Sequence, residues 1–181
     1  NEGIASVGEP YSGYIDPTNP RACYPNGKRV AETLCVSYTK QYGIDTVIAR
    51  PCHIYGPTAT ELDSRVSAQF IKSVLSGQDI VLKSLGNQLR SYCYVADCAS
   101  GILSVLLKGK TSNAYNISNE ASTITIREMA EMIAQMSGRA IRFELADDNE
   151  KASYNPASLS VLSARKLEAL GWRAQCDMAT G

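Results

Sequence analysis

A tyrosine and a lysine four residues apart are the side chains of this sequence best suited to proton chemistry. Tyr24 and Lys28 lie in the stretch "CYPNGKRVAET", residues 23–33. A phenol has an ordinary pKa of ~10, and a nearby ammonium group lowers it by stabilising the phenolate. Because a spacing of four places both side chains on one helical face, the pair could exchange a proton with a hydroxyl or carbonyl while hydride passes to a nicotinamide. The same spacing also arises on the solvated face of an ordinary helix.

The elements that must position this pair alternate between helix and strand. Glycines and prolines interrupt residues 1–22, which predicts a loop. A helix over 23–42 with Gly43 as its C-cap leads to a strand at 45–51 and a turn at "IYGP". Further helices are predicted over 64–75, from an Asp97 cap to about Leu107, from the Thr125–Glu128 capping box to Gly138, and within 163–172. Further strands are predicted over 79–84, 91–95, 114–118 and 140–145, with a turn at 85–88. This order predicts an α/β fold.

The helix that begins at Thr125 carries three methionines at helical spacing. Met129, Met132 and Met136 share a stripe with Ile126 and Ile133. This stripe favours core packing over a methionine-rich binding face.

Composition sets limits on the class of protein. The 181 residues are enough for one sizeable core and few for two. Hydrophobic residues make up 44% and charged residues 20%, as in ordinary globular proteins. Lys plus Arg (18) equals Asp plus Glu (18), so no charge excess favours nucleic acid or an anionic membrane as a partner. We also find no membrane-spanning apolar run and no signal peptide pattern.

Six cysteines are scattered along the chain, and none forms a C-x-x-C pair. With a single histidine, His53, this pattern argues against a zinc ribbon or finger, and we predict no metal site. Scattered cysteines in a chain with a good core favour free thiols in a reducing compartment, and we therefore expect a cytoplasmic protein.

No strand–glycine-rich loop–helix that could hold a dinucleotide phosphate occurs in the sequence. We therefore expect the chain to be the C-terminal part of a larger protein and to be catalytically inactive by itself.

Several stretches occur in an order that resembles a known family. They are "PRACYPNGKRVAETL", "YGIDTVIARPCHIYGP", "LRSYCYVAD", "AYNISN" and "LEALGW". In this order they resemble the extended short-chain dehydrogenase/reductase superfamily, and within it the NAD-dependent nucleotide-sugar epimerases and dehydratases. "PRACY…GKRVAETL" and "RSYCYV" look most like UDP-glucuronate decarboxylases, and 4,6-dehydratases and 4-epimerases remain open.

The resemblance implies a role for each matching residue around the cofactor. Tyr24 matches the catalytic tyrosine, and Lys28 matches the lysine that lowers its pKa and bonds the nicotinamide ribose. Pro51 and Cys52 fall beside the cofactor, which the resemblance implies is NAD.

Further residues match the part of the family that binds a UDP- or dTDP-linked sugar. Ile80 and Val81 fall where the backbone of family members contacts the nucleobase. Arg90 matches an arginine that binds the diphosphate, and Asn116 falls at a position that often helps bind the nucleotide. His53 stands where many relatives carry an asparagine that bonds the diphosphate; it could donate one such bond or be a turn histidine bonded to backbone.

Leu159 and Ser163 depart from the family, because relatives often place an arginine and an aspartate there. This departure leaves open a relative that binds nucleotide sugars without turnover. The resemblance otherwise implies that residues 1–56 are the end of a Rossmann NAD-binding domain and that 57–181 are mainly a smaller α/β substrate-binding subdomain. It also implies an enzyme that passes through a transient 4-keto sugar, with a homodimer possible in the full-length protein.

Overall fold

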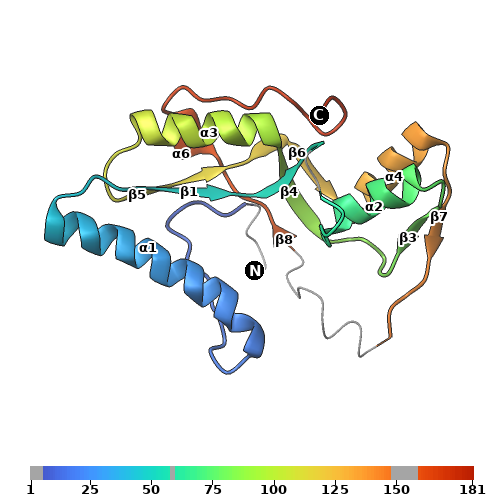
Figure 1. Cartoon of the computed structure of the whole chain (residues 1–181), viewed down its shortest axis with the longest axis horizontal. Coiled ribbons are helices and arrows are strands. Elements are labelled where there is room, and N and C mark those ends of the chain that lie inside the picture. Colours follow the sequence, from blue (N-terminus) through green and yellow to red (C-terminus); the bar gives the residue numbers. More distant parts are fainter. Residues whose placement is uncertain (1–5, 58–59, 148–158) are drawn as a thin grey trace.

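The computed structural model describes residues 6–57, 60–147 and 159–181, which form a mixed α/β fold (Figure 1). Strands β1 (Val47–Pro51) and β5 (Asn113–Ile117) pair in parallel, with Arg50 opposite Asn116. Helices α1 (Cys23–Tyr42) and α3 (Val95–Lys108) lie on opposite sides of this pair (Figure 1). These layers match the predicted Rossmann-like arrangement, in which helices cover both faces of a parallel sheet.

The first hydrophobic core lies between α3 and the β1–β5 pair. It also takes in the short helix α6 (Arg165–Glu168) and Trp172, whose Nε1 donates to Ser100 Oγ at 3.0 Å. Helix and strand approach so closely here that a Cβ on Gly101 would lie 2.9 Å from Ile117 Cγ2. Only glycine allows α3 to pack against β5 at this distance.

The second hydrophobic core lies at the other end of the molecule. Strands β3 (Ile80–Leu82) and β7 (Ile141–Phe143) pair in parallel, and α2 (Val66–Leu75) and α4 (Ile126–Ser137) pack against them (Figure 1). The buried side chains of this core are Phe70, Ile80, Leu82, Tyr92, Met129, Ala130 and Ala134.

A central sheet joins the two cores. Strand β4 (Leu89–Tyr94) pairs in parallel with β2 (His53–Tyr55) and β8 (Leu159–Ser160), and antiparallel with β6 (Asn119–Thr125). Successive side chains of a strand point to opposite faces. Accordingly Cys93 is buried in the first core and Tyr92 in the second, so both cores use the same strand.

Local signals in the sequence placed two of the helices correctly. Helix α1 spans the predicted 23–42 and ends at Gly43, whose φ of 68° is the left-handed C-cap conformation. Helix α4 begins at the predicted capping box, where Thr125 and Glu128 bond reciprocally, and ends at Gly138 with φ 65°. Within its described residues, the predicted N-terminal loop is interrupted by the 3-10 helix η1 (Pro20–Ala22) and by an isolated β-bridge between Val7 and Leu162.

Two predictions about the elements were wrong or incomplete. Ile54 and Tyr55 of the predicted "IYGP" turn belong to strand β2, because they pair with β4. Strands β6 and β8 were not predicted; both are short or polar and are defined by their pairing with β4.

Asp97 is not the cap of α3. The helix begins two residues earlier, and Tyr94 occupies the N-cap position. The buried Asp97 carboxylate instead accepts the backbone N–H groups of Gln175 (3.0 Å) and Cys176 (2.9 Å) through Oδ2. It thereby fixes the C-terminal segment against the first turn of α3.

The methionine stripe of α4 is only partly buried. Met129 is in the second core as predicted, but Met136 is 74% exposed, which corrects that prediction. All six cysteines are free. Among the described helices, none has the length and apolar character to cross a lipid bilayer.

Candidate active site

Tyr24 and Lys28 lie together on an accessible face of α1. The helix starts at Cys23, so Tyr24 is in its first turn and Lys28 is one turn further. The Lys28 ammonium is 5.3 Å from the centre of the Tyr24 ring, and the Tyr24 side chain is 70% exposed. The structure therefore brings the predicted pair together in a place that a ligand can reach.

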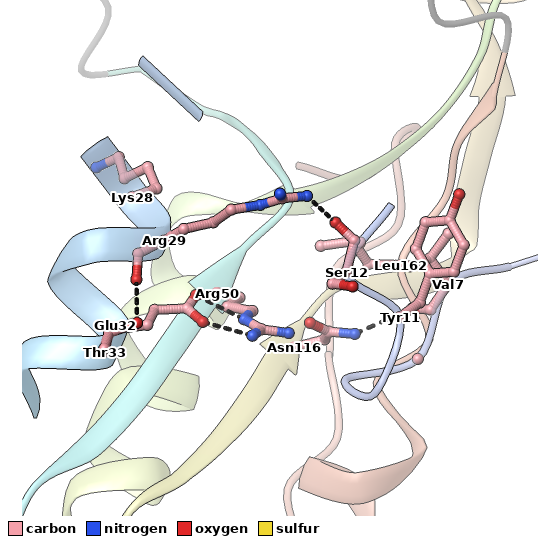
Figure 2. Close-up of a pocket in the computed structure, with 11 residues that line it drawn as sticks. Val7, Tyr11, Ser12, Lys28, Arg29, Glu32, Thr33, Arg50, Asn116 and Leu162 are labelled. Carbon is pink, nitrogen blue, oxygen red and sulfur yellow. Dashed lines mark hydrogen bonds and ion pairs between the residues drawn. The ribbon is translucent and has the colours of Figure 1, made fainter. Parts of the chain in front are cut away.

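A pocket of ≈ 470 Å³ lies beside this face of α1 (Figure 2). Its walls come from α1, the ends of β1 and β5, the N-terminal loop and the segment after β8. The residues that line it include Val7, Tyr11, Ser12, Lys28, Arg29, Glu32, Thr33, Arg50, Asn116 and Leu162.

An ion pair joins α1 to β1 across this pocket. Arg50 donates through Nε to Glu32 Oε1 (2.7 Å) and through Nη2 to Glu32 Oε2 (2.5 Å), as Figure 2 shows. The hydrogen bond that Arg50 donates to Glu32 is the main cause of the raised pKa of Arg50. A bidentate pair of this type fixes orientation as well as distance.

Polar bonds also hold the N-terminal loop against this site. Arg50 Nη1 donates to the Glu9 carbonyl (2.9 Å), while the Glu9 carboxylate accepts the backbone N–H of Asn116 (2.9 Å). Asn116 is buried, and its Nδ2 donates to the carbonyls of Val7 (3.0 Å) and Ser163 (3.2 Å). Its side-chain donors are thus used to connect three segments, and a contact between Asn116 and a nucleotide stays a prediction.

Pro51 and Cys52 lie at the carboxyl end of β1, on the side of the molecule where Arg50 holds α1. The Cys52 thiol is partly buried beside the first core. Burial raises its pKa to about 12, and burial also raises the pKa of the Cys93 and Cys98 thiols. These groups are therefore protonated at neutral pH, which argues against nucleophilic attack by Cys52. Contact of Cys52 with a cofactor stays a prediction.

The six cysteines should differ widely in reactivity. At pH 8, a thiol with a pKa of about 12 is ionised about a thousandfold less than an ordinary cysteine. We expect iodoacetamide to modify the exposed Cys23 readily and to leave Cys52, Cys93 and Cys98 largely unmodified in the native protein. Timed alkylation with peptide mass mapping measures this, and unfolding in guanidinium should equalise the rates. Native labelling of Cys93 as fast as Cys23 would contradict the burial described here.

The predicted diphosphate residues His53 and Arg90 lie on neighbouring strands. His53 on β2 is opposite Tyr92 on β4, and their ring centres are 5.5 Å apart. Desolvation lowers the pKa of His53, and the positive charge of Arg90 lowers it further, so the imidazole is neutral at pH 7. Neutral His53 can donate one hydrogen bond to an anion, and buried Arg90 supplies the positive charge beside it. His53 is a strand residue, which excludes a turn position for it.

The remaining predicted residues occupy three other places. Ile80 is buried in β3 and Val81 is half-buried beside it, with the strand's backbone paired to β7. Leu159 pairs with Leu89 through the backbone of β8. Ser163 donates its backbone N–H to the Val7 carbonyl and accepts from Asn116, so this position supports the N-terminal loop.

A second, apolar pocket of ≈ 720 Å³ lies between α2, α4 and the C-terminal turn. All four methionines of the chain line it: Met129, Met132, Met136 and Met178. It is separate from the pocket beside Tyr24 and Lys28, and the two share no lining residue.

Glu32 and Arg50 are the site residues that the sequence analysis missed. One signal was available, because Tyr24, Lys28 and Glu32 recur at intervals of four and therefore share a helical face. Arg50 gave no comparable signal, since its partner is 18 positions away on another element.

Together, the parallel strands, their flanking helices and the tyrosine–lysine pair define a Rossmann-like protein of the short-chain dehydrogenase/reductase class. Residues 4–118 match the NAD dependent epimerase/dehydratase family, and the chain belongs to this family. This confirms the predicted resemblance and fold, and NAD is the cofactor that the family's description names.

Curated relatives are similar along nearly the whole chain. UDP-glucuronic acid decarboxylase 3 of Arabidopsis thaliana is 33% identical over 173 residues, which cover 96% of this chain and 49% of that protein. UDP-glucuronic acid decarboxylase 1 of Danio rerio is 37% identical over 177 residues, covering 96% and 40%. The chain thus spans about half the length, or less, of the curated relatives it matches.

Solved structures show the same fold. A dTDP-glucose 4,6-dehydratase from Streptomyces venezuelae with NAD bound superposes with a TM-score of 0.79 at 25% identity, covering 98% of this chain and 52% of that one. A UDP-glucuronic acid 4-epimerase from Bacillus cereus, in complex with UDP-glucuronic acid and NAD, gives a TM-score of 0.80 at 22% identity and covers 100% and 55%.

Proposed function

We propose that this chain is the C-terminal part of an NAD-dependent enzyme that acts on a nucleotide sugar, with UDP-glucuronate decarboxylation as the favoured reaction. The observation that carries the proposal is the Tyr24–Lys28 pair, with the ammonium 5.3 Å from the ring centre on an accessible helix face. Similarity to UDP-glucuronic acid decarboxylases at 33–37% identity supports the choice of substrate. The substrate would be a UDP- or dTDP-linked sugar.

The residues of the site fit a nicotinamide cofactor. Lys28 would bond the nicotinamide ribose, and Pro51 and Cys52 would lie against the ring, where a protonated thiol offers an unreactive contact. Bound NAD would supply a hydride acceptor and donor for C4 of the sugar. The chain contains no glycine-rich phosphate loop, and we therefore propose that its 181 residues are inactive without a segment that binds the cofactor phosphates.

In the proposed reaction, Tyr24 accepts the proton of the C4 hydroxyl as the sugar is oxidised to a transient 4-keto form. The Lys28 ammonium, 5.3 Å from the centre of the Tyr24 ring, would contribute a positive charge beside this proton transfer. A 4-keto group makes bonds at the neighbouring carbons labile, which permits decarboxylation, dehydration or epimerisation. Tyr24 then returns the proton when the keto group is reduced.

The substrate would extend from Tyr24 toward the central sheet. His53 and Arg90 would bind the diphosphate, as a hydrogen-bond donor beside a guanidinium group. The backbone of Ile80 and Val81 would meet the nucleobase, and Asn116 would support the nucleotide. Residues 1–56 would then serve mainly the cofactor and 57–181 mainly the substrate, although β5 and α3 pack with β1 in one core.

We also infer a homodimer in the cytoplasm. Four apolar side chains of α1 form an exposed row at intervals of four: Val30, Leu34, Tyr38 and Tyr42. Such a row is suited to helix–helix packing with a second copy. Free thiols at all six cysteines favour a reducing compartment.

A second candidate function is binding of nucleotide sugars without turnover. His53, Leu159 and Ser163 favour it, because they replace residues that the family often uses as diphosphate ligands.

Mixing the complete gene product with NAD and UDP-glucuronic acid distinguishes the two functions. We expect transient NADH absorbance, release of carbon dioxide and a UDP-pentose product in the mass spectrum. dTDP-glucose serves as the matched alternative substrate, and calorimetry measures binding of both. Heat of binding with neither NADH nor product would contradict the enzyme and establish the binding protein.

A further inference from the structure

Three functional side chains of α1 lie in successive turns of one face. Tyr24, Lys28 and Glu32 are spaced by four residues, and Lys28 and Glu32 both line the pocket shown in Figure 2. Glu32 is the member of this row that is bonded to the sheet. Both of its carboxylate oxygens accept hydrogen bonds from the Arg50 guanidinium, at 2.7 and 2.5 Å.

Arg50 is placed to transmit this contact to the rest of the site. It is the residue before Pro51 on β1, and it lies opposite Asn116 on β5. Its third hydrogen bond, from Nη1 to the Glu9 carbonyl at 2.9 Å, reaches the N-terminal loop. One guanidinium group thus connects the helix, the strand and the loop that surround the pocket.

Helix α1 depends on such contacts because it has no buried side chain. Near its C-terminal end, Thr39 Oγ1 and Thr46 Oγ1 are hydrogen-bonded at 2.8 Å. Near its N-terminal end, Arg29 donates to the carbonyls of Ser12 and Gly13 in an exposed loop. Between these two points, Glu32 contacts Arg50 on a strand of the sheet. The Glu32 side chain is only 30% exposed and the Arg50 side chain 31%.

We propose that Glu32 and Arg50 are positioning residues, which hold the Tyr24–Lys28 face of α1 in register with the end of β1 that carries Pro51 and Cys52. The proposal rests on the proposed role of Tyr24. A planar guanidinium bonded at two points resists both rotation of the helix and sliding along the strand. Displacement of a catalytic group by about 1 Å can cost about 10²-fold in rate.

The test measures steady-state kinetics of the complete gene product with Glu32→Gln. We expect kcat to fall by about 10- to 100-fold while KM for the nucleotide sugar stays unchanged, because the variant misplaces Tyr24 and leaves the substrate contacts intact. The primary isotope effect on C4-deuterated substrate should rise, because the C4 step becomes rate-limiting. Arg50→Lys keeps the positive charge but removes the two-point guanidinium bond to Glu32. It should reproduce both the fall in kcat and the rise in the isotope effect.

Two further variants separate positioning from general loss of stability. The double variant Glu32→Gln/Arg50→Lys should be no slower than either single variant, since the two residues act as one unit. Glu131→Gln is the matched control: it removes the charge of the 2.9 Å ion pair between Arg127 and Glu131 on α4, and it should change neither kcat nor the isotope effect.

Amide hydrogen exchange gives a readout that does not need turnover. We expect faster exchange at residues 24–32 in Glu32→Gln than in the unsubstituted protein. Unchanged kcat and isotope effect in both single variants, in a protein that Tyr24→Phe inactivates, would overturn the positioning role and leave the proposed function standing. If Tyr24→Phe retains full activity, the proposed function fails, and unchanged exchange at residues 24–32 would then overturn the anchoring role as well.

Discussion

Tyr24→Phe should lower kcat of the complete gene product by about 10²- to 10⁴-fold, the range that a positioned general acid or base contributes. The variant loses only the phenolic oxygen, which exchanges the proton with the sugar C4 hydroxyl in the proposed reaction. The ring stays on the accessible face of α1, and 70% exposure means that packing does not depend on it. Turnover with UDP-glucuronic acid and binding by calorimetry are the two measurements, and we expect binding to persist.

Tyr38→Phe is the matched control for this substitution. Tyr38 is on the same helix and 51% exposed, and its ring centre lies 5.3 Å from that of Tyr42. It is more than three turns from Tyr24, on the row that we assign to the dimer. The kcat of the Tyr38→Phe variant should equal that of the unsubstituted protein. Equal losses in both variants would show that the effect of Tyr24→Phe is not chemical.

Asp97→Ala should give a large loss of stability, about 2–4 kcal/mol in the free energy of unfolding. The carboxylate holds the backbone N–H groups of Gln175 and Cys176 at 3.0 and 2.9 Å, and alanine leaves both without this acceptor. Hydrogen bonds to a charged acceptor are about twice as strong as neutral ones. Release of the C-terminal segment would also expose the edge of the first core near Trp172.

Asp97→Asn tests whether the hydrogen bonds of Asp97 or its negative charge contribute more to the free energy of unfolding. The amide oxygen can still accept both N–H groups, so we expect about half the loss seen for alanine. Urea unfolding followed by fluorescence of Trp172, the single tryptophan of the chain, measures both variants close to the site. A loss in Asp97→Ala no larger than in Asp97→Asn would contradict the role of Asp97 as a hydrogen-bonded anchor.

Elements specified by local chemistry could be predicted from the sequence. The bounds of α1 follow from its run of helix-forming residues and from Gly43, and the start of α4 follows from Thr125 and Glu128. Elements specified by distant partners could not. The polar strand β6 exists because it pairs with β4, and a register shift between Ser91 and Tyr92 obscures the alternation that would have indicated it.

The candidate site divides in the same way. The Tyr24–Lys28 pair is a local pattern, and the structure places the two side chains together as expected. The Glu32–Arg50 bond is not local, and Asp97 had two competing roles that sequence spacing does not separate. Asp97 in a first turn is favourable near the helix dipole whether or not it caps the helix. The structure shows that Asp97 is buried under the C-terminal segment and anchors it, rather than capping α3.

The sharing of β4 by both cores limits how the molecule can move around a ligand. Tyr92 and Cys93 are consecutive residues anchored in opposite cores, and the strand pairs on both of its edges. A hinge at this strand would have to unpack both cores at once, and close-packed interiors resist such deformation. We therefore expect the two ends of the molecule to move little relative to each other along β4. We expect any opening or closing over the proposed ligand to come from the surrounding loops, with little change in the distance between Arg90 and the end of β1.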